Sequence, residues 1–213
     1  MMRTIFRATV LLTACSFLAT IALAQQGPAR AQLDRFSSGL DTLYATFEQQ
    51  VIDNDGKVQD ASSGQVWLSR PELFRWEYGG DFPELVVADG ERIWIYDEML
   101  EQVTVKDQAA ADFDSPLTLL TDPSRLDQQF EAREVGEAEG MQLLELKARN
   151  METQFERLML GLKDDRLAMM IMEDAFGLRT EIRFQQIELN PNLDRELFTF
   201  TPPESADVIG SIQ

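Results

Sequence analysis

The chain has 213 residues, with 37 acidic residues against 19 lysines and arginines, one cysteine and no histidine, so its formal net charge is −18. This length and an apolar content of 44% suit one domain with a sizeable core, and the negative charge argues against a nucleic-acid partner. The lack of histidine removes the commonest general base and every imidazole metal ligand.

The N-terminal segment has the pattern of an export signal. Arg3 and Arg7 precede residues 8–24, which carry no charge and end in Ala22-Leu23-Ala24. A basic start, an apolar middle and a small-residue end are typical of a secretory signal peptide. We therefore expect residues 1–24 to be cleaved off and residues 25–213 to form a single domain.

Cys15 offers an alternative. The sequence Leu12-Thr13-Ala14-Cys15 resembles a lipobox, in which the cysteine is lipidated and anchors the chain. Only residues 8–12 would then form the apolar segment, which is shorter than such signals usually have, so cleavage after Ala24 is favoured. The mature chain would then have no cysteine, no disulfide and no thiol nucleophile.

The sequence after the signal predicts one helix followed mainly by strands. Apolar residues at Leu33, Phe36, Leu40 and Leu43 have helical spacing. Eleven strands are expected, at residues 46–52, 65–68, 74–78, 84–88, 92–96, 102–105, 129–135, 141–148, 154–162, 167–173 and 180–189. A short helix is expected to begin at Ser115-Pro116 and to end at Pro123. Regularly spaced short strands are typical of an antiparallel meander or barrel.

The strands contain many large, soft side chains: Trp67, Trp76 and Trp94, and the cluster Met159, Met169, Met170 and Met172. Methionine and aromatic residues suit a surface that accepts flexible apolar ligands. The same residues also fit an ordinary core, and the sequence alone leaves both interpretations open.

No sequence motif indicates catalysis, a cofactor or a metal. There is no Gly-x-Ser-x-Gly elbow, no phosphate-binding glycine loop and no zinc motif. Aligning Asp53-Asn54-Asp55-Gly56 with a calcium loop places Val51 and Ser62 where acidic ligands are required. We expect a turn there, and a protein that is not an enzyme.

One stretch resembles a known family. Its residues are Gly64-Gln-Val-Trp67-Leu-Ser-Arg70-Pro71-Glu-Leu-Phe74-Arg-Trp76. They are similar to the G-x-[LV]-W-[VL]-x-R-P-x-x-F-x-W pattern of LolA-type outer-membrane lipoprotein carrier proteins. Further matches follow the order of the family: Phe47-x-Gln49, residues 87–90 with Trp94-x-Tyr96, residues 101–105, and Phe198-Thr-Phe-Thr-Pro202-Pro203.

The resemblance implies a mainly β fold, an unclosed antiparallel half-barrel with a lid of short helices over an apolar cavity. It also implies a monomeric periplasmic chaperone that carries triacylated lipoproteins. Such carriers take cargo from an inner-membrane ABC lipoprotein-releasing complex and pass it to an outer-membrane lipoprotein acceptor. A membrane-anchored acceptor of the LolB type and a lipid-sensing envelope module of the same shape remain as alternatives, and the mature N-terminus would separate carrier from anchored form.

The resemblance also implies roles for particular residues. Arg70 matches an arginine that hydrogen-bonds the lid, and Phe74 matches an aromatic residue that faces the cavity. From their places in the motif and the strand pattern, we expect the cavity lining to include Phe47, Trp67, Phe74, Trp76, Met159, Met170 and Met172.

Overall fold

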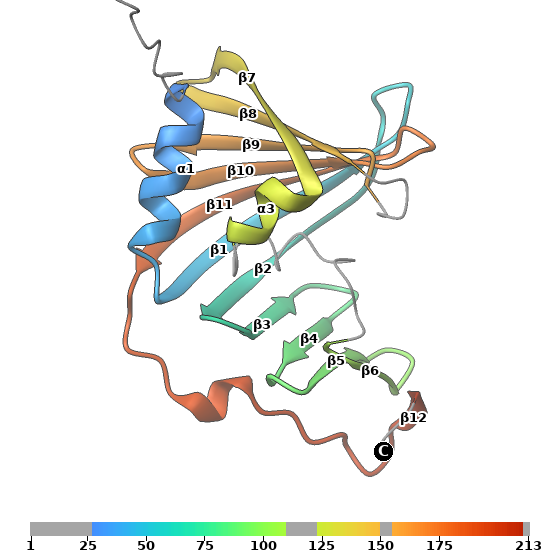
Figure 1. Cartoon of the computed structure of the whole chain (residues 1–213). Coiled ribbons are helices and arrows are strands. Elements are labelled where there is room, and N and C mark those ends of the chain that lie inside the picture. Colours follow the sequence, from blue (N-terminus) through green and yellow to red (C-terminus); the bar gives the residue numbers. More distant parts are fainter. Residues whose placement is uncertain (1–26, 110–122, 150–154, 211–213) are drawn as a thin grey trace, which may run out of the picture.

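The computed structural model describes residues 27–109, 123–149 and 155–210. The expected signal peptide, Cys15 and the expected helix after Ser115 lie outside these residues. Two helices, α1 (Pro28–Ser38) and α3 (Pro123–Gln129), lie on the same side of one twelve-stranded sheet (Figure 1). The strands are β1 (Thr42–Ile52), β2 (Val58–Ser69), β3 (Leu73–Tyr78), β4 (Glu84–Ala88), β5 (Arg92–Asp97), β6 (Gln102–Asp107), β7 (Phe130–Ala138), β8 (Met141–Ala148), β9 (Arg157–Lys163), β10 (Arg166–Glu173), β11 (Arg179–Leu189) and β12 (Asp207–Gly210). A short 3₁₀ helix, η1 (Arg195–Phe198), lies between β11 and β12.

The sheet is open. Its strand order is β12-β6-β5-β4-β3-β2-β1-β11-β10-β9-β8-β7, so β12 and β7 form two separate edges. Each neighbouring pair is antiparallel except β12 and β6. The predicted unclosed antiparallel half-barrel is therefore confirmed.

Several predicted details differ from the structure, among them the start of β2, which lies at Val58 and not at residue 65. The sequence did not indicate β12, which has four residues and pairs in parallel with β6. The first helix ends at Ser38, and Leu43 belongs to β1. Pro123 begins α3 instead of ending a helix. Proline suits this position because it has no backbone N–H, and N–H groups in the first turn have no partner within the helix.

Strand alternation gives the sheet two chemically different faces. The inner face, which α1 and α3 cover, carries the main apolar cluster, including Phe74 and Trp76. The outer face carries a smaller cluster centred on Val87, Trp94, Val103 and Val105. Phe200 packs on that second cluster, with its ring centroid 5.9 Å from that of Trp94. The segment after η1 thus covers part of the outer face.

Helix α1 packs across β7, β8, β9 and β10 through Ala29, Leu33 and Phe36, all buried. Their spacing of four and three residues places them on one side of the helix. Within the three described ranges, no helix combines the length and apolar character needed to cross a membrane.

Candidate functional site

The centre of the inner face is a group of aromatic rings. The Phe47 ring centroid lies 4.3 Å from that of Trp76 and 5.3 Å from that of Tyr78. Phe184 on β11 meets Trp76 edge to face, with the centroids 6.3 Å apart. Rings from β1, β3 and β11 therefore form one continuous apolar surface.

Five of the residues expected to line a cavity belong to the same buried cluster: Phe47, Phe74, Trp76, Met170 and Met172. Phe74 is 2% exposed and Met170 is fully buried. They come from β1, β3 and β10, which lie far apart in the sequence and close together in the sheet.

Trp67 and Met159 lie elsewhere. Trp67 falls between Val66 and Leu68, which both point to the inner face, so its side chain is on the outer face. There its ring centroid lies 5.5 Å from that of Tyr44. Met159 likewise alternates with the inward-facing Leu158 and Leu160. The expectation that these two residues share a lining with Phe74 is therefore corrected.

The inner apolar surface is covered in this structure. Leu33 and Phe36 of α1, Leu126 of α3 and Phe130 at the start of β7 are all buried in the same cluster as Phe74. One hollow of about 710 Å³ is lined by residues such as Glu48, Asp60 and Tyr78, and another of about 700 Å³ by residues such as Arg70 and Leu73. Neither is lined by the central rings of Phe47, Phe74 and Trp76, which are buried in the main cluster with residues of α1 and α3.

Arg70 fastens the end of α1. Its Nη1 donates to the carbonyl oxygens of Ser37, at 2.7 Å, and Leu40, at 3.2 Å. Its backbone N–H donates to the carbonyl oxygen of Asp41 at 2.9 Å. The last carbonyls of a helix lack partners within the helix, so this guanidinium stabilises the junction between α1 and β1.

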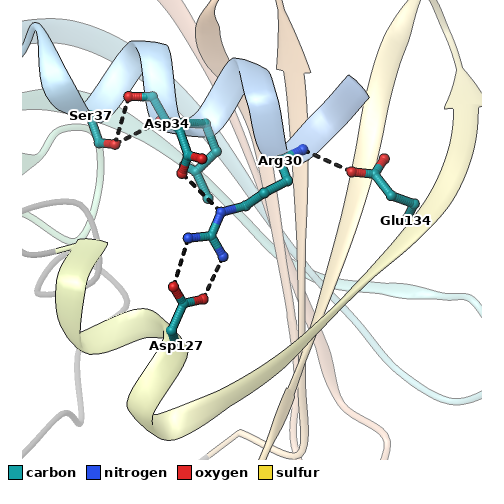
Figure 2. A network of polar contacts seen from close by, with 6 residues as sticks. Arg30, Asp34, Ser37, Asp127 and Glu134 are labelled. Atoms are coloured by element: carbon teal, nitrogen blue, oxygen red, sulfur yellow. Dashed lines mark hydrogen bonds and ion pairs between the residues drawn. The ribbon is translucent and has the colours of Figure 1, made fainter. Parts of the chain in front are cut away.

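A second polar network joins α1 to α3 and β7 (Figure 2). The Arg30 guanidinium forms a two-pronged contact with Asp127 on α3, with Nη1–Oδ1 and Nη2–Oδ2 distances of 2.5 and 2.8 Å. Its Nε donates to Asp34 at 2.9 Å. The Glu134 carboxylate on β7 accepts the backbone N–H groups of Ala29 and Arg30 at 3.1 and 2.9 Å. Sequence reasoning missed these residues, because opposite charges about a hundred positions apart give no local signal.

The charges of this network stabilise one another. The side-chain hydrogen bond from Arg30 lowers the pKa of Asp127, and the hydrogen bond to Asp127 is the largest cause of the raised pKa of Arg30. A carboxylate at the α1 N-terminus also complements the helix dipole. Residue 27, before this terminus, is glycine, and any side chain there would meet the Glu134 carboxyl group.

The aromatic group contains one ionisable side chain, Tyr78. Its hydroxyl donates to Oε1 of Gln49 at 3.1 Å. Burial raises the pKa of Tyr78 to about 12. The phenol therefore stays neutral at physiological pH and adds no charge to the apolar surface.

The site has the chemistry of binding. In the part of the chain that the structure describes, no three acidic, cysteine or histidine residues are grouped as metal ligands. What the inner face offers is a wide layer of apolar side chains under two short helices. Such a surface suits a hydrocarbon chain when it is uncovered.

In comparisons with known proteins, the matching family model and the similar sequences indicate the same family. Residues 38–201 match the family model described as outer membrane lipoprotein carrier protein LolA. An outer-membrane lipoprotein carrier protein of Xanthomonas campestris pv. campestris (strain B100) is 41% identical over 187 residues, covering 87% of this chain and 90% of that protein. One from Dechloromonas aromatica (strain RCB) is 42% identical over 200 residues, covering 94% and 96%.

A solved structure shares the fold. An uncharacterized conserved protein from Thermus thermophilus superposes with a TM-score of 0.57 over 86% of this chain and 99% of its own length. The two sequences are 17% identical, so this likeness concerns the fold alone.

Proposed function

The chain belongs to the LolA family of outer-membrane lipoprotein carrier proteins, and we propose that it binds the acyl chains of lipoproteins on its inner apolar face and carries them across the periplasm. The observation that carries this proposal is the continuous apolar layer around Phe47, Phe74 and Trp76 beneath α1 and α3. A layer of this kind, covered by short helices, suits a ligand that must be shielded from water and later released.

Physical chemistry explains why such cargo needs a carrier. Transfer of a methylene group from water to an apolar environment is worth about 0.8 kcal/mol. Three acyl chains of roughly sixteen carbons would therefore cost on the order of 40 kcal/mol to expose fully to water. A lipoprotein consequently requires a protein that replaces the membrane around its acyl chains during transit.

The proposal extends to partners and location. The chain is exported through residues 1–24 and works as a monomer in the periplasm. It receives triacylated lipoproteins from an inner-membrane ABC lipoprotein-releasing complex and passes them to an outer-membrane acceptor. It needs no cofactor and performs no catalytic step.

Arg70 acts as a latch in this cycle. Its bonds to the carbonyls of Ser37 and Leu40 support this role, because they hold the α1 end of the cover against the barrel. Stabilising the covered state lowers the net affinity for cargo, and a carrier needs limited affinity in order to release.

Native mass spectrometry of the protein purified from periplasm tests the carrier function. The expected result is a bound polypeptide carrying acyl chains and a mature N-terminus at Gln25. A diacylated Cys15 at the N-terminus would instead support an anchored acceptor. Purely unbound protein, together with unchanged lipoprotein sorting after its depletion from cells, would contradict the proposal.

A further inference from the structure

The two helices that cover the inner face differ in the contacts that their described residues make. Helix α1 is bound at both ends: Glu134 accepts its first N–H groups, and Arg70 donates to the Ser37 carbonyl in its last turn. Just beyond its C-terminal end, Nδ2 of Asn190 donates to the carbonyl of Gly39 at 2.7 Å. These anchors come from β7, the end of β2 and the segment after β11.

The middle of α1 is also attached. The backbone N–H of Asp165, in the β9–β10 turn, donates to Oε1 of Gln32 at 3.0 Å. Its carboxylate forms an ion pair with Arg35 at 2.8 Å. Together with buried Leu33 and Phe36, these contacts hold the middle of α1 against the sheet.

Helix α3 is described through the side chains of residues 126–129, and at its C-terminal end the Gln129 carbonyl accepts the backbone N–H of Arg149 at 2.8 Å. Leu126 is buried in the main cluster, and Asp127 holds the Arg30 guanidinium. Oε1 of Gln129 is buried without a hydrogen-bond partner among the described residues, which is unfavourable for the closed position. The polar contact that Figure 2 shows between the two helices is the Arg30–Asp127 pair.

From this difference we infer that Arg30 and Asp127 are positioning residues for cargo uptake: their ion pair holds α3 closed against a fixed α1, and its rupture uncovers the inner face. Opening then begins with α3 while α1, still held at both ends, carries Arg30, and release of α1 from Arg70 follows as a later step of loading. This inference rests on the proposed carrier function and adds to it the contact that controls access.

The strength of the pair suits a reversible contact. Arg30 is one-fifth exposed and Asp127 is more than half exposed, so water and salt weaken their attraction. The two-pronged geometry nevertheless restricts how the guanidinium and the carboxylate can be oriented relative to each other. A pair of this kind shifts an equilibrium by a few-fold, so entering acyl chains can overcome it.

The test compares Asp127→Asn with Asp165→Asn. Both changes remove one carboxylate charge that faces an α1 arginine, but only Asp127 lies on α3. Asn is suitable at position 165, where φ is 57°, because it tolerates the left-handed region. Hydrogen exchange followed by mass spectrometry reports opening of residues 123–129 and 28–38 without any ligand. Binding of the apolar dye bis-ANS and of a palmitoylated peptide reports access to the inner face.

We expect Asp127→Asn to speed exchange in α3 about two- to fivefold, with α1 unchanged, and to tighten dye and peptide binding by a similar factor. High NaCl should produce the same change in the wild type and little change in Asp127→Asn. Asp165→Asn should match the wild type in α3 exchange and in dye and peptide binding, with any faster exchange confined to α1. Equal exchange in α3 for all three proteins, or faster exchange in α1 than in α3 of Asp127→Asn, would overturn the inference. If no protein binds the palmitoylated peptide, the carrier function fails, while exchange still decides whether the pair holds α3.

Discussion

Phe47 and Tyr78 meet edge to face above Gly64, although the strands that carry them are not neighbours. Phe47 on β1 pairs with Gly64 on β2, and Gly64 pairs with Tyr78 on β3. The two rings can lean over the middle strand because it has no side chain at that position. Their planes are 83° apart and their centroids 5.3 Å apart. A single glycine thus allows the aromatic layer of the inner face to be continuous.

Gly64→Ala should destabilise the protein by about 1–3 kcal/mol, because the new methyl group meets the backbone of β3 at Glu77 and also overpacks this layer. Its Cβ would lie 2.8 Å from Cζ of Phe47 and would also meet the carbonyl oxygen of Glu77. Urea unfolding at neutral pH measures the effect. Gly79→Ala is the matched control, since its Cβ would come no closer than 3.8 Å to the Ser63 carbonyl oxygen, an ordinary van der Waals contact. Equal stability of the two variants would contradict this account of Gly64.

Phe74→Glu should abolish binding of acylated ligands, because it places a carboxylate in the apolar layer. An unpaired buried carboxylate costs several kcal/mol or takes up a proton, and acyl chains filling the site would remove any water that relieves it. Binding of a palmitoylated peptide is the measurement, with far-UV circular dichroism to confirm folding.

Trp67→Glu is the control for this experiment. Trp67 lies on the adjacent strand β2 but faces outward, next to Tyr44. A carboxylate there can remain hydrated, so peptide binding should stay close to that of the wild type. Loss of binding in Trp67→Glu with normal binding in Phe74→Glu would show that the faces are assigned wrongly.

Local signals in the sequence were sufficient for the order of most elements, because turns such as Asp53–Gly56 and alternation such as that around Phe74 are local. That the sheet is open was expected only from the family resemblance. The sequence did not show on which face of the sheet the Trp67 side chain lies. Val66, Trp67 and Leu68 are all apolar, so alternation cannot tell which of them points inward. The structure shows apolar clusters on both faces of the sheet, and this removes the contrast that sequence reasoning needs.

Contacts between segments that are distant in the chain were also not predictable from the sequence. Strand β12 depends on its parallel pairing with β6, and the Arg30–Asp127 pair joins residues 97 positions apart. Neither has a periodic pattern, since each depends on tertiary proximity. By contrast, the family resemblance implied that Arg70 bonds the lid, and the Arg70 guanidinium donates to the Ser37 carbonyl at the end of α1.

The stability of the protein should fall at high pH through Tyr78. Burial raises the pKa of Tyr78 to about 12, whereas an exposed tyrosine has a pKa of about 10. Between these values the unfolded chain loses the phenolic proton and the folded chain keeps it, so ionisation favours unfolding. The stabilisation that comes from the protonated phenol is complete below a pH of about 10. As pH rises to about 12, the free energy of unfolding falls by roughly 2–3 kcal/mol.

Tyr78→Phe isolates this effect, because phenylalanine cannot ionise. At neutral pH the wild type should be more stable by about 1 kcal/mol, owing to the hydrogen bond to Gln49. That advantage should shrink and then reverse as pH rises from 10 to 12. Denaturant unfolding of both proteins across this range is the measurement, and a constant difference would show that Tyr78 is not protected by burial.

Arg70→Leu should load cargo normally or more readily but hand it over poorly. The guanidinium bonds to the carbonyls of Ser37 and Leu40 favour the covered, empty state, and leucine cannot replace them. Without them the cargo-bound state gains relative stability, because a ligand competes with whatever stabilises the empty form. Transfer of a radiolabelled lipoprotein from the carrier to a purified outer-membrane acceptor measures the second step, and release from inner-membrane vesicles measures the first. Arg70→Lys should show an intermediate defect, since its ammonium can still donate to a carbonyl but lacks the planar fork. Normal hand-over by Arg70→Leu, or a failure to load at all, would remove Arg70 from the role of latch and leave it as a structural tie between β2 and α1.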